Sequence, residues 1–171
     1  MSMDRTSGPI VVGELNPYGA DPYYALYDEP KGASGDRLRR IFGLSRDTYA
    51  RLDKRNICDG KWSIVAARLC ADSIISERRP LILLGSKVHS AFGYDDLDAP
   101  SIVAPDQSVH PARLIMPHPS GLCRRWREPG IVDYIRDLLN GLCPSIPWGE
   151  AGLTLPGSSP RIITVTTGAT P

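Results

Sequence analysis

The sequence predicts an α/β fold, a three-layer α/β/α sandwich built on a central, mainly parallel four-stranded sheet. Short apolar runs rich in β-branched residues alternate along the chain with longer segments of helical periodicity. Strands connected through helices pair in parallel by right-handed crossovers, which places helices on both faces of the sheet. A chain of 171 residues has room for one such domain. We expect it over residues 1–148, followed by a tail or an added edge strand over 149–171.

The first half of the chain is predicted to contain two strands and three helices. Residues 9–15 (PIVVGEL) are too few for a helix and rich in β-branched side chains, so they form the first, central strand. Ser34 and Ser45 each cap a helix, because a serine side chain accepts a hydrogen bond from the first-turn backbone. Residues 55–58 then form a short strand. The third helix has one apolar face, which comprises Trp62, Val65, Ala66, Leu69, Cys70 and Ile74.

The second half repeats this alternation. Residues 81–84 (LILL) form a buried strand, after which Gly85 and Ser86 lead into a helix. Residues 113–116 (RLIM) form the last core strand. Weaker strand signals at 102–103 and 162–165 indicate edge strands. The final helix carries apolar residues at helical spacing, namely Ile131, Tyr134, Ile135, Leu138 and Leu139.

Composition and charge favour an ordinary globular protein. The net charge is +1, and no window approaches the roughly 18 apolar residues of a membrane span. The N-terminus lacks the apolar core of a signal peptide, so we expect a cytoplasmic location and no membrane partner. The four cysteines are widely spaced and form no C-x-x-C pair. This pattern indicates reduced thiols rather than a zinc or iron–sulfur site.

Basic residues are concentrated in two segments. The first segment contains Arg37, Arg39, Arg40, Arg46, Arg51, Lys54 and Arg55. The second contains Arg124, Arg125 and Arg127. Both segments are suited to neutralising nucleic-acid phosphates, and a solvated helix face explains the first one equally well.

Polar residues and tight turns follow the predicted strands. Asn16, Asn56, Gly85 and His118 all lie at or just past a strand end. Because the carboxyl ends of parallel strands meet at one edge of a sheet, these residues are expected to converge on a binding crevice there. The other histidines, His89 and His110, have no evident partner and are expected at the surface.

Two motifs resemble the signatures of the uracil-DNA glycosylase superfamily. Residues 13–18 (GELNPY) follow the first strand, and residues 116–122 (MPHPSGL) follow the last. Residues 55–58 (RNIC) and 80–88 also resemble the family, so the likeness covers about 9–142. It implies a monomeric, monofunctional DNA glycosylase that needs no metal or cofactor. Such an enzyme hydrolyses the N-glycosidic bond of uracil, or of a related deaminated or C5-modified pyrimidine, and leaves an abasic site in DNA.

The resemblance also assigns roles to residues of the pocket. Asn16 would orient a water molecule and face the cation that develops on the sugar, while His118 would donate a hydrogen bond to the departing base. Asn56 would read the Watson–Crick edge of the base with one donor and one acceptor. Glu14 is either a second catalytic carboxylate or a residue that holds the loop. Tyr18 would exclude large groups at C5.

Further residues are assigned to base stacking and to DNA. Tyr24 or Tyr27 would stack on the base, and Leu122 would push into the duplex as the base flips out. DNA contacts are implied for Ser120, Gly121, Arg124 and Arg125. The first motif combines Gly-Glu of the iron–sulfur branch with Asn-Pro-Tyr of other branches, which leaves the base open. Two alternatives remain: a non-catalytic protein that binds nucleic acid or a modified nucleotide, and an enzyme acting on a hypermodified pyrimidine.

Overall fold

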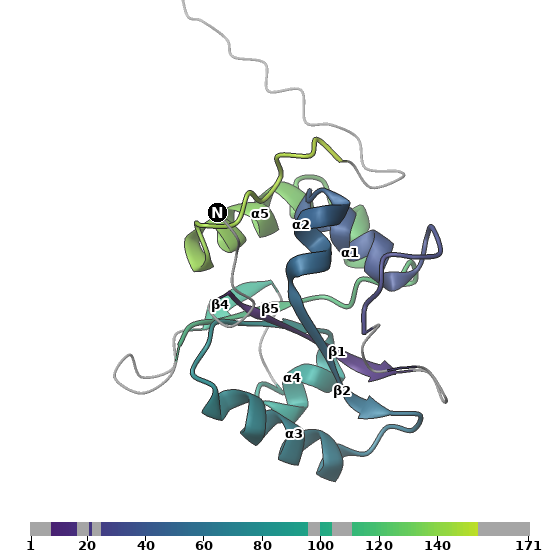
Figure 1. Ribbon diagram of the computed structural model, residues 1–171, viewed down its shortest axis with the longest axis vertical. Coiled ribbons are helices and arrows are strands. Elements are labelled where there is room, and N and C mark those ends of the chain that lie inside the picture. Colours follow the sequence, from purple (N-terminus) through teal and green to yellow (C-terminus); the bar gives the residue numbers. More distant parts are fainter. Residues whose placement is uncertain (1–7, 17–20, 22–24, 96–99, 104–110, 154–171) are drawn as a thin grey trace, which may run out of the picture.

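The computed structural model describes residues 8–16, 21, 25–95, 100–103 and 111–153. Its middle layer is a five-stranded sheet with the strand order β2-β1-β3-β5-β4 (Figure 1). The strands are β1 (Ile10–Asn16), β2 (Asp53–Asp59), β3 (Leu81–Leu84), β4 (Ser101–Val103) and β5 (Arg113–Met116). The predicted α/β class is therefore confirmed.

Four of the five strands run parallel, and they are the four that the sequence predicts as the core. The predicted number of strands is one too low. The fifth strand, β4, pairs antiparallel with β5 at one edge. A parallel pair needs a long crossover connection, whereas the short segment between β4 and β5 permits only an antiparallel return. The weak signal at 102–103 marks this edge strand.

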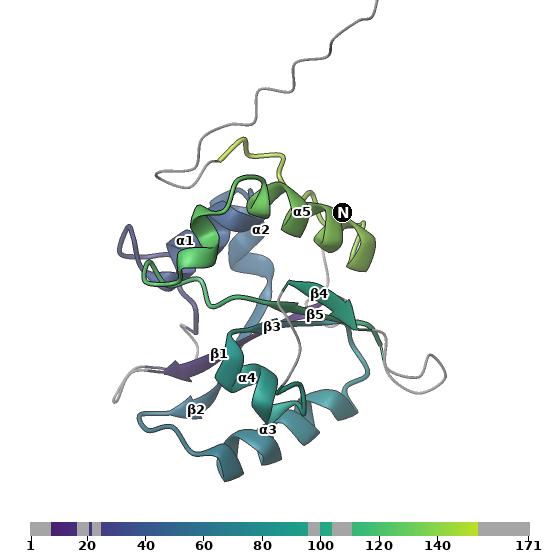
Figure 2. The same ribbon diagram turned by 180° about the vertical axis from the view of Figure 1, so that it is seen from behind.

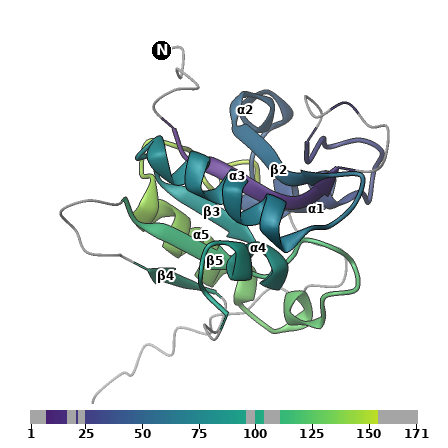
Figure 3. The same ribbon diagram turned by 90° about the horizontal axis from the view of Figure 1, so that it is seen from below.

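Helices cover both faces of the sheet (Figures 1 and 2). On one face lie α1 (Ser34–Phe42), α2 (Arg46–Arg51) and α5 (Ile131–Leu142). On the other lie α3 (Ile64–Ser76) and α4 (Ser86–Ala91), which stand in front of the sheet when it is seen from below (Figure 3). A short 3-10 helix, η2 (Arg124–Arg127), precedes α5. The result is the predicted three-layer sandwich.

The inner strands β1, β3 and β5 are buried on both faces, so their side chains alternate between two apolar cores rather than between core and water. Val11, Ile82 and Leu114 pack toward α1 and α5, whereas Val12 and Leu83 pack toward α3 and α4. All five side chains are fully buried. This two-sided burial explains why the strands appear in the sequence as continuous apolar runs.

The predicted apolar face of the third helix is only partly right. Ile74 is buried as predicted, but Val65 and Leu69 are each 68% exposed. The structure buries Ala67 and Ala71, which were not predicted, beside Ile74. Helix α3 carries apolar side chains almost all round, so periodicity alone does not select its inner face. Alanines face the sheet because a small side chain lets the helix approach closely.

Two expectations about single residues also need correction. Ser34 does not cap α1: the N-cap is Ala33, and the Asp36 carboxylate accepts the Gly32 N–H instead, at 2.9 Å. His89 is not at the surface but 5% exposed. Its Nε2 lies 3.2 Å from the Leu83 carbonyl and 3.1 Å from that of Met116, between β3 and β5. Ser45 does cap α2, as predicted, by accepting the N–H of Thr48.

The contacts of the domain continue past residue 148. The Gly149 N–H donates to the Phe42 carbonyl at 2.8 Å, and the Ala151 N–H donates to that of Gly43 at 2.9 Å.

The predicted strand at 162–165 lies outside the described residues, as does His110. Tyr134, predicted on the apolar face of α5, is 49% exposed.

All four cysteines are free thiols, as the sequence predicts. Among the residues that the structure describes, no helix has the length and apolar character needed to cross a bilayer.

Candidate active site

Four parallel strands deliver the predicted site residues to one edge of the sheet. Val12 of β1 pairs with Arg55 of β2 and with Leu83 of β3. Toward the carboxyl ends of these strands, β2 carries Asn56 one residue after Arg55, and β1 carries Glu14 two residues after Val12. His118 arrives at this edge from the turn after β5. We call Glu14, Asn56, Lys87 and His118 together the carboxyl edge.

Asn56 lies within β2 rather than at its end, because the strand extends to Asp59. It pairs with Gly13 of β1, and its carboxamide lies directly across that glycine. A Cβ atom added at Gly13 would stand 2.1 Å from Asn56 Oδ1 and 3.3 Å from Leu26 Cδ1. Any larger residue at position 13 would therefore displace the carboxamide. Gly13 of the Gly-Glu motif and Asn56 of β2 are therefore neighbours across the two strands.

A second glycine makes room for His118. Gly85 follows β3 with φ of +88°, a conformation that favours glycine. A Cβ atom there would lie 3.0 Å from the Cβ of His118. The Gly85 N–H donates to the Met116 carbonyl at 2.9 Å, which ties the two turns together. The Leu-Gly turn after β3 thus forms the surface on which His118 rests.

The hydrogen bonds of His118 define its tautomer. The Ser120 N–H donates to Nδ1 at 3.2 Å, so the proton of the neutral ring sits on Nε2 and makes that atom a donor. Burial lowers the pKa of His118 below its ordinary value of 6.5, with Glu14 opposing the shift and Lys87 adding to it. Trp126 Nε1 donates to the His118 carbonyl at 2.7 Å and holds the backbone. The ring is therefore a neutral, fixed donor at neutral pH.

Glu14 is held beside this histidine by an ion pair. Lys87 Nζ lies 2.5 Å from Glu14 Oε1 and 5.4 Å from the ring centroid of Trp62. The sequence pattern predicted neither Lys87 nor Trp62 as a site residue. The one signal that could have indicated Lys87 is its position directly after the Gly85-Ser86 turn. The ion pair keeps a carboxylate at the edge, and both predicted roles of Glu14 remain compatible with it.

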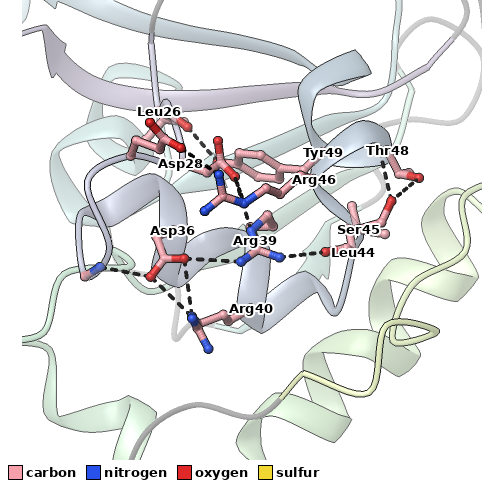
Figure 4. Close-up of polar contacts among 12 residues, drawn as sticks. Leu26, Asp28, Asp36, Arg39, Arg40, Leu44, Ser45, Arg46, Thr48 and Tyr49 are labelled. Atoms are coloured by element: carbon pink, nitrogen blue, oxygen red, sulfur yellow. Dashed lines mark hydrogen bonds and ion pairs between the residues drawn. The ribbon is translucent and has the colours of Figure 1, made fainter.

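The loop leading into α1 packs against the same edge. Leu26 has a positive φ of 52°, and its side chain reaches the Asn56–Gly13 pair. The Tyr49 hydroxyl donates to the Leu26 carbonyl at 2.8 Å. Asp28 in the same loop lies 3.3 Å from the Arg39 guanidinium (Figure 4). These contacts fix Leu26 as one wall beside the Asn56 carboxamide.

Most side chains of the first basic segment are bound to the protein's own acidic or carbonyl groups. Arg39 and Arg40 bind Asp36, and Arg46 lies 2.6 Å from Glu29. Arg55 binds Asp53 and Glu77, and Lys54 binds two backbone carbonyls. We call the cluster of Asp28, Asp36, Arg39, Arg40 and Arg46 the arginine–carboxylate network (Figure 4).

The turn after His118 projects from the surface. Leu122 is 93% exposed, so its side chain is open to a ligand. Ser120 is half-buried and Gly121 is exposed. Arg124 and Arg125 in η2 are exposed as well. The turn therefore presents the exposed Leu122 beside two exposed arginines, an arrangement that fits the DNA contacts predicted for these residues.

Other predicted site residues cannot be placed fully. Asn16 is the last residue of β1, where its backbone pairs with Asp59, but its side chain lies outside the part that the structure describes. Tyr18 and Tyr24 also lie outside the described residues. Tyr27 is described and is 48% exposed. The structure thus places Glu14 close enough to His118 to affect its pKa, whereas Asn56 lies on β2, across Gly13 of β1.

Metal-binding clusters and surface depressions are the other places in the described chain where a ligand could bind. No three His, Cys, Asp or Glu side chains within it come together as a metal site. A surface depression of about 430 Å³ lies at the start of α5, and none of the carboxyl-edge residues lines it. Its lining includes the acidic residues Glu128, Asp133 and Asp137, which would repel a polyanion.

Comparison with protein-family models and with curated proteins found no match to this sequence. The function of the chain must therefore be inferred from the geometry of the carboxyl edge.

Proposed function

We propose that the chain is a DNA glycosylase that hydrolyses the N-glycosidic bond of uracil or a related deaminated or C5-modified pyrimidine. One observation supports this most directly. The neutral His118, with its proton on Nε2, follows β5, and the Asn56 carboxamide projects from β2 of the same sheet. Three strand spacings, roughly 14 Å, separate those strands. A pyrimidine ring bound between the two side chains would fit such a span.

Cleaving the glycosidic bond leaves negative charge on the departing base. A donor aimed at the base oxygen stabilises this charge most when it is already oriented and shielded from water. His118 meets the first condition, since the Ser120 N–H fixes its tautomer and Trp126 fixes its backbone, and its partial burial contributes to the second. A neutral imidazole is sufficient for this role, as in other sites where burial lowers a histidine pKa.

Recognition of the base falls to Asn56. Its carboxamide carries an acceptor and a donor side by side, the pattern that the Watson–Crick edge of uracil complements. Gly13 leaves the space in which this carboxamide lies, and Leu26 packs beside it. A carboxylate or an ammonium at this position would supply only half of the pattern.

The cation on the sugar needs negative charge or a lone pair nearby. Glu14, ion-paired with Lys87, supplies a carboxylate at the edge, and Asn16 follows two residues later at the end of β1. In the proposed mechanism Asn16 orients the attacking water. No metal is required for these steps.

The base itself must leave the helical stack before any of these groups can reach it. The exposed Leu122 is suited to fill the gap that the base leaves, and the cations of η2 are suited to the phosphates around it.

The experiment is a substrate panel. Single- and double-stranded oligonucleotides carrying uracil, hydroxymethyluracil, hypoxanthine, thymine opposite guanine or modified pyrimidines are incubated with the protein, and abasic sites are cleaved with alkali. We expect strand cleavage on at least one uracil-like substrate. Binding without cleavage on every substrate would overturn the glycosylase proposal and favour the non-catalytic alternative.

Variants of the two catalytic residues test the assignment. Asn16→Ala and His118→Ala should each slow excision by about 100-fold or more, as loss of one preorganised stabiliser does. Asn140→Ala, an exposed position on α5, is the matched control and should leave the rate unchanged. Unchanged rates in both site variants would show that the site lies elsewhere.

A further inference from the structure

Helix α1 sends one arginine to the turn that carries His118. Arg37 Nε donates to the Pro119 carbonyl at 2.8 Å, a contact between residues 82 positions apart in the chain. Pro119 directly follows His118. Arg37 therefore supports the backbone of the catalytic turn from a different element.

The remainder of the guanidinium points along the same turn toward its tip. The Cζ and Nη1 atoms of Arg37 lie 3.9 Å from the position that a Cβ atom would take at Gly121. Gly121 has no side chain to cover them, and the next residue is the exposed Leu122. Arg37 itself is half-exposed.

Arg37 also differs from its neighbours on α1 in its charge partners. Arg39 and Arg40 form ion pairs with Asp28 or Asp36, whereas Arg37 forms no ion pair with any acidic group in the described residues. Its one hydrogen bond uses Nε and leaves the Nη fork directed along the turn. A planar fork of this kind matches two phosphate oxygens at once.

We propose that Arg37 binds a phosphate of the DNA strand next to the base that Leu122 displaces, and that this contact positions the His118 turn. The inference rests on the proposed function in that its ligand is DNA. One side chain would bind the strand through Nη1 and Nη2 and the turn through Nε. Strand binding and placement of the leaving-group donor are thereby coupled.

Three substitutions separate the two contacts. In Arg37→Gln the amide nitrogen takes the place of Nε along the side chain, so the Pro119 contact can persist without the charge. In Arg37→Lys the charge persists, but a methylene stands where Nε was. Arg37→Met removes both. Arg68→Gln on α3, at an exposed position on the opposite face of the sheet, is the control for a simple change in net charge.

The measurements are DNA affinity as a function of salt and the single-turnover excision rate. Each phosphate contact contributes about 0.7 to 0.9 to the slope of log K against log salt. Arg37→Gln should reduce the slope by about that amount, with a larger effect on affinity than on rate. Arg37→Lys should keep the slope and slow excision on the order of 10-fold, because the turn shifts. Arg37→Met should show both defects.

The outcomes distinguish this inference from the glycosylase proposal. A protein that binds DNA without excising any base would refute the glycosylase proposal, and the salt slopes would still decide the role of Arg37. If excision occurs but Arg37→Gln has the same slope as Arg68→Gln, Arg37 binds no phosphate. Equal rates for Lys and wild-type proteins would refute its positioning role. Failure of the wild-type protein to bind DNA would refute both proposals. Thermal melting of each variant checks that it is folded.

Discussion

The arginine–carboxylate network and the carboxyl edge are both dense in polar groups, yet they are built in opposite ways. In the network, Arg39 is surrounded by Asp28 and Asp36, and the side chains of all three are at most 12% exposed. At the carboxyl edge, Asn56 and His118 are only half-buried. His118 uses Nδ1 inside the protein and keeps its Nε2 proton available to a ligand.

The difference shows that the number of charged residues in a segment does not identify a binding site. Seven basic residues between 37 and 55 suggested a phosphate surface, but most of them neutralise carboxylates of the same domain. The proposed site is marked instead by half-exposed polar side chains and by glycines that make room for them. Arg37 has this property within the basic segment, and it lies beside the turn that carries His118.

The largest expected effect belongs to the network and concerns stability. Arg39→Met removes one partner from two buried carboxylates, which should lower the free energy of unfolding by about 3 to 5 kcal/mol. Urea denaturation measures this directly. The excision rate per folded molecule should change far less, because Arg39 does not reach the carboxyl edge.

Arg68→Met provides the matched control, since Arg68 is exposed on α3. It should shift the unfolding free energy by no more than about 0.5 kcal/mol. A loss below about 1 kcal/mol in Arg39→Met would mean that the network does not stabilise the fold as described.

A smaller effect, on catalysis, is expected at the carboxyl edge. Gly13→Ala places a methyl group where the Asn56 carboxamide lies, only 2.1 Å from its oxygen. Loss of a correctly placed polar pair costs about 1 to 3 kcal/mol, so kcat/KM should fall about 10- to 100-fold. Gly141→Ala on α5 meets no atom within 4 Å and should leave kcat/KM unchanged. Equal activity of the two variants would show that Asn56 does not read the base.

The smallest expected effect is the response to pH. The folded-state pKa of His118 lies below 6.5, so excision should be constant above about 6.5 and fall several-fold as the pH drops through the folded-state value. A protonated ring would carry hydrogen on Nδ1, which then opposes the Ser120 N–H. A pH–rate profile tests this, and a rate that rises on acidification would contradict it.

Stability should follow the same direction. Burial also lowers the pKa of His89. The unfolded chain therefore binds more protons than the folded one as the pH falls below 6.5, and the folded state loses stability in that window. The arginine–carboxylate network loses its stabilising effect at lower pH. The Gly32 N–H and the ion pairs with Arg40 and Arg39 outweigh the effect of burial and lower the pKa of Asp36 below 3.8.

The core of the fold was predictable because β1, β3 and β5 are short apolar runs that end in a turn residue. LILL at 81–84 and RLIM at 113–116 match β3 and β5 residue for residue. The topology then follows from the alternation with helices. That Glu14, Asn56 and His118 lie toward the carboxyl ends of these strands was predictable for the same reason.

What the sequence could not predict depends on contacts between distant segments. The inner face of α3 is set by which residues let the helix approach the sheet, and its apolar pattern is nearly uniform. His89 is buried because β3 and β5 offer it two carbonyls, and the one from β5 belongs to Met116, 27 residues away in the chain. Arg37 reaches Pro119 only in the folded structure. No local motif encodes such pairs.

The two outer strands carry a consequence for aggregation. An exposed strand edge is a template on which another chain can add a strand. Here β4 has only three residues, and β2 begins with Asp53, Lys54 and Arg55, a charged segment tied to Glu77 and Arg79 by ion pairs. Short length protects one border and charge protects the other. Both borders are therefore poor templates for a strand from another molecule.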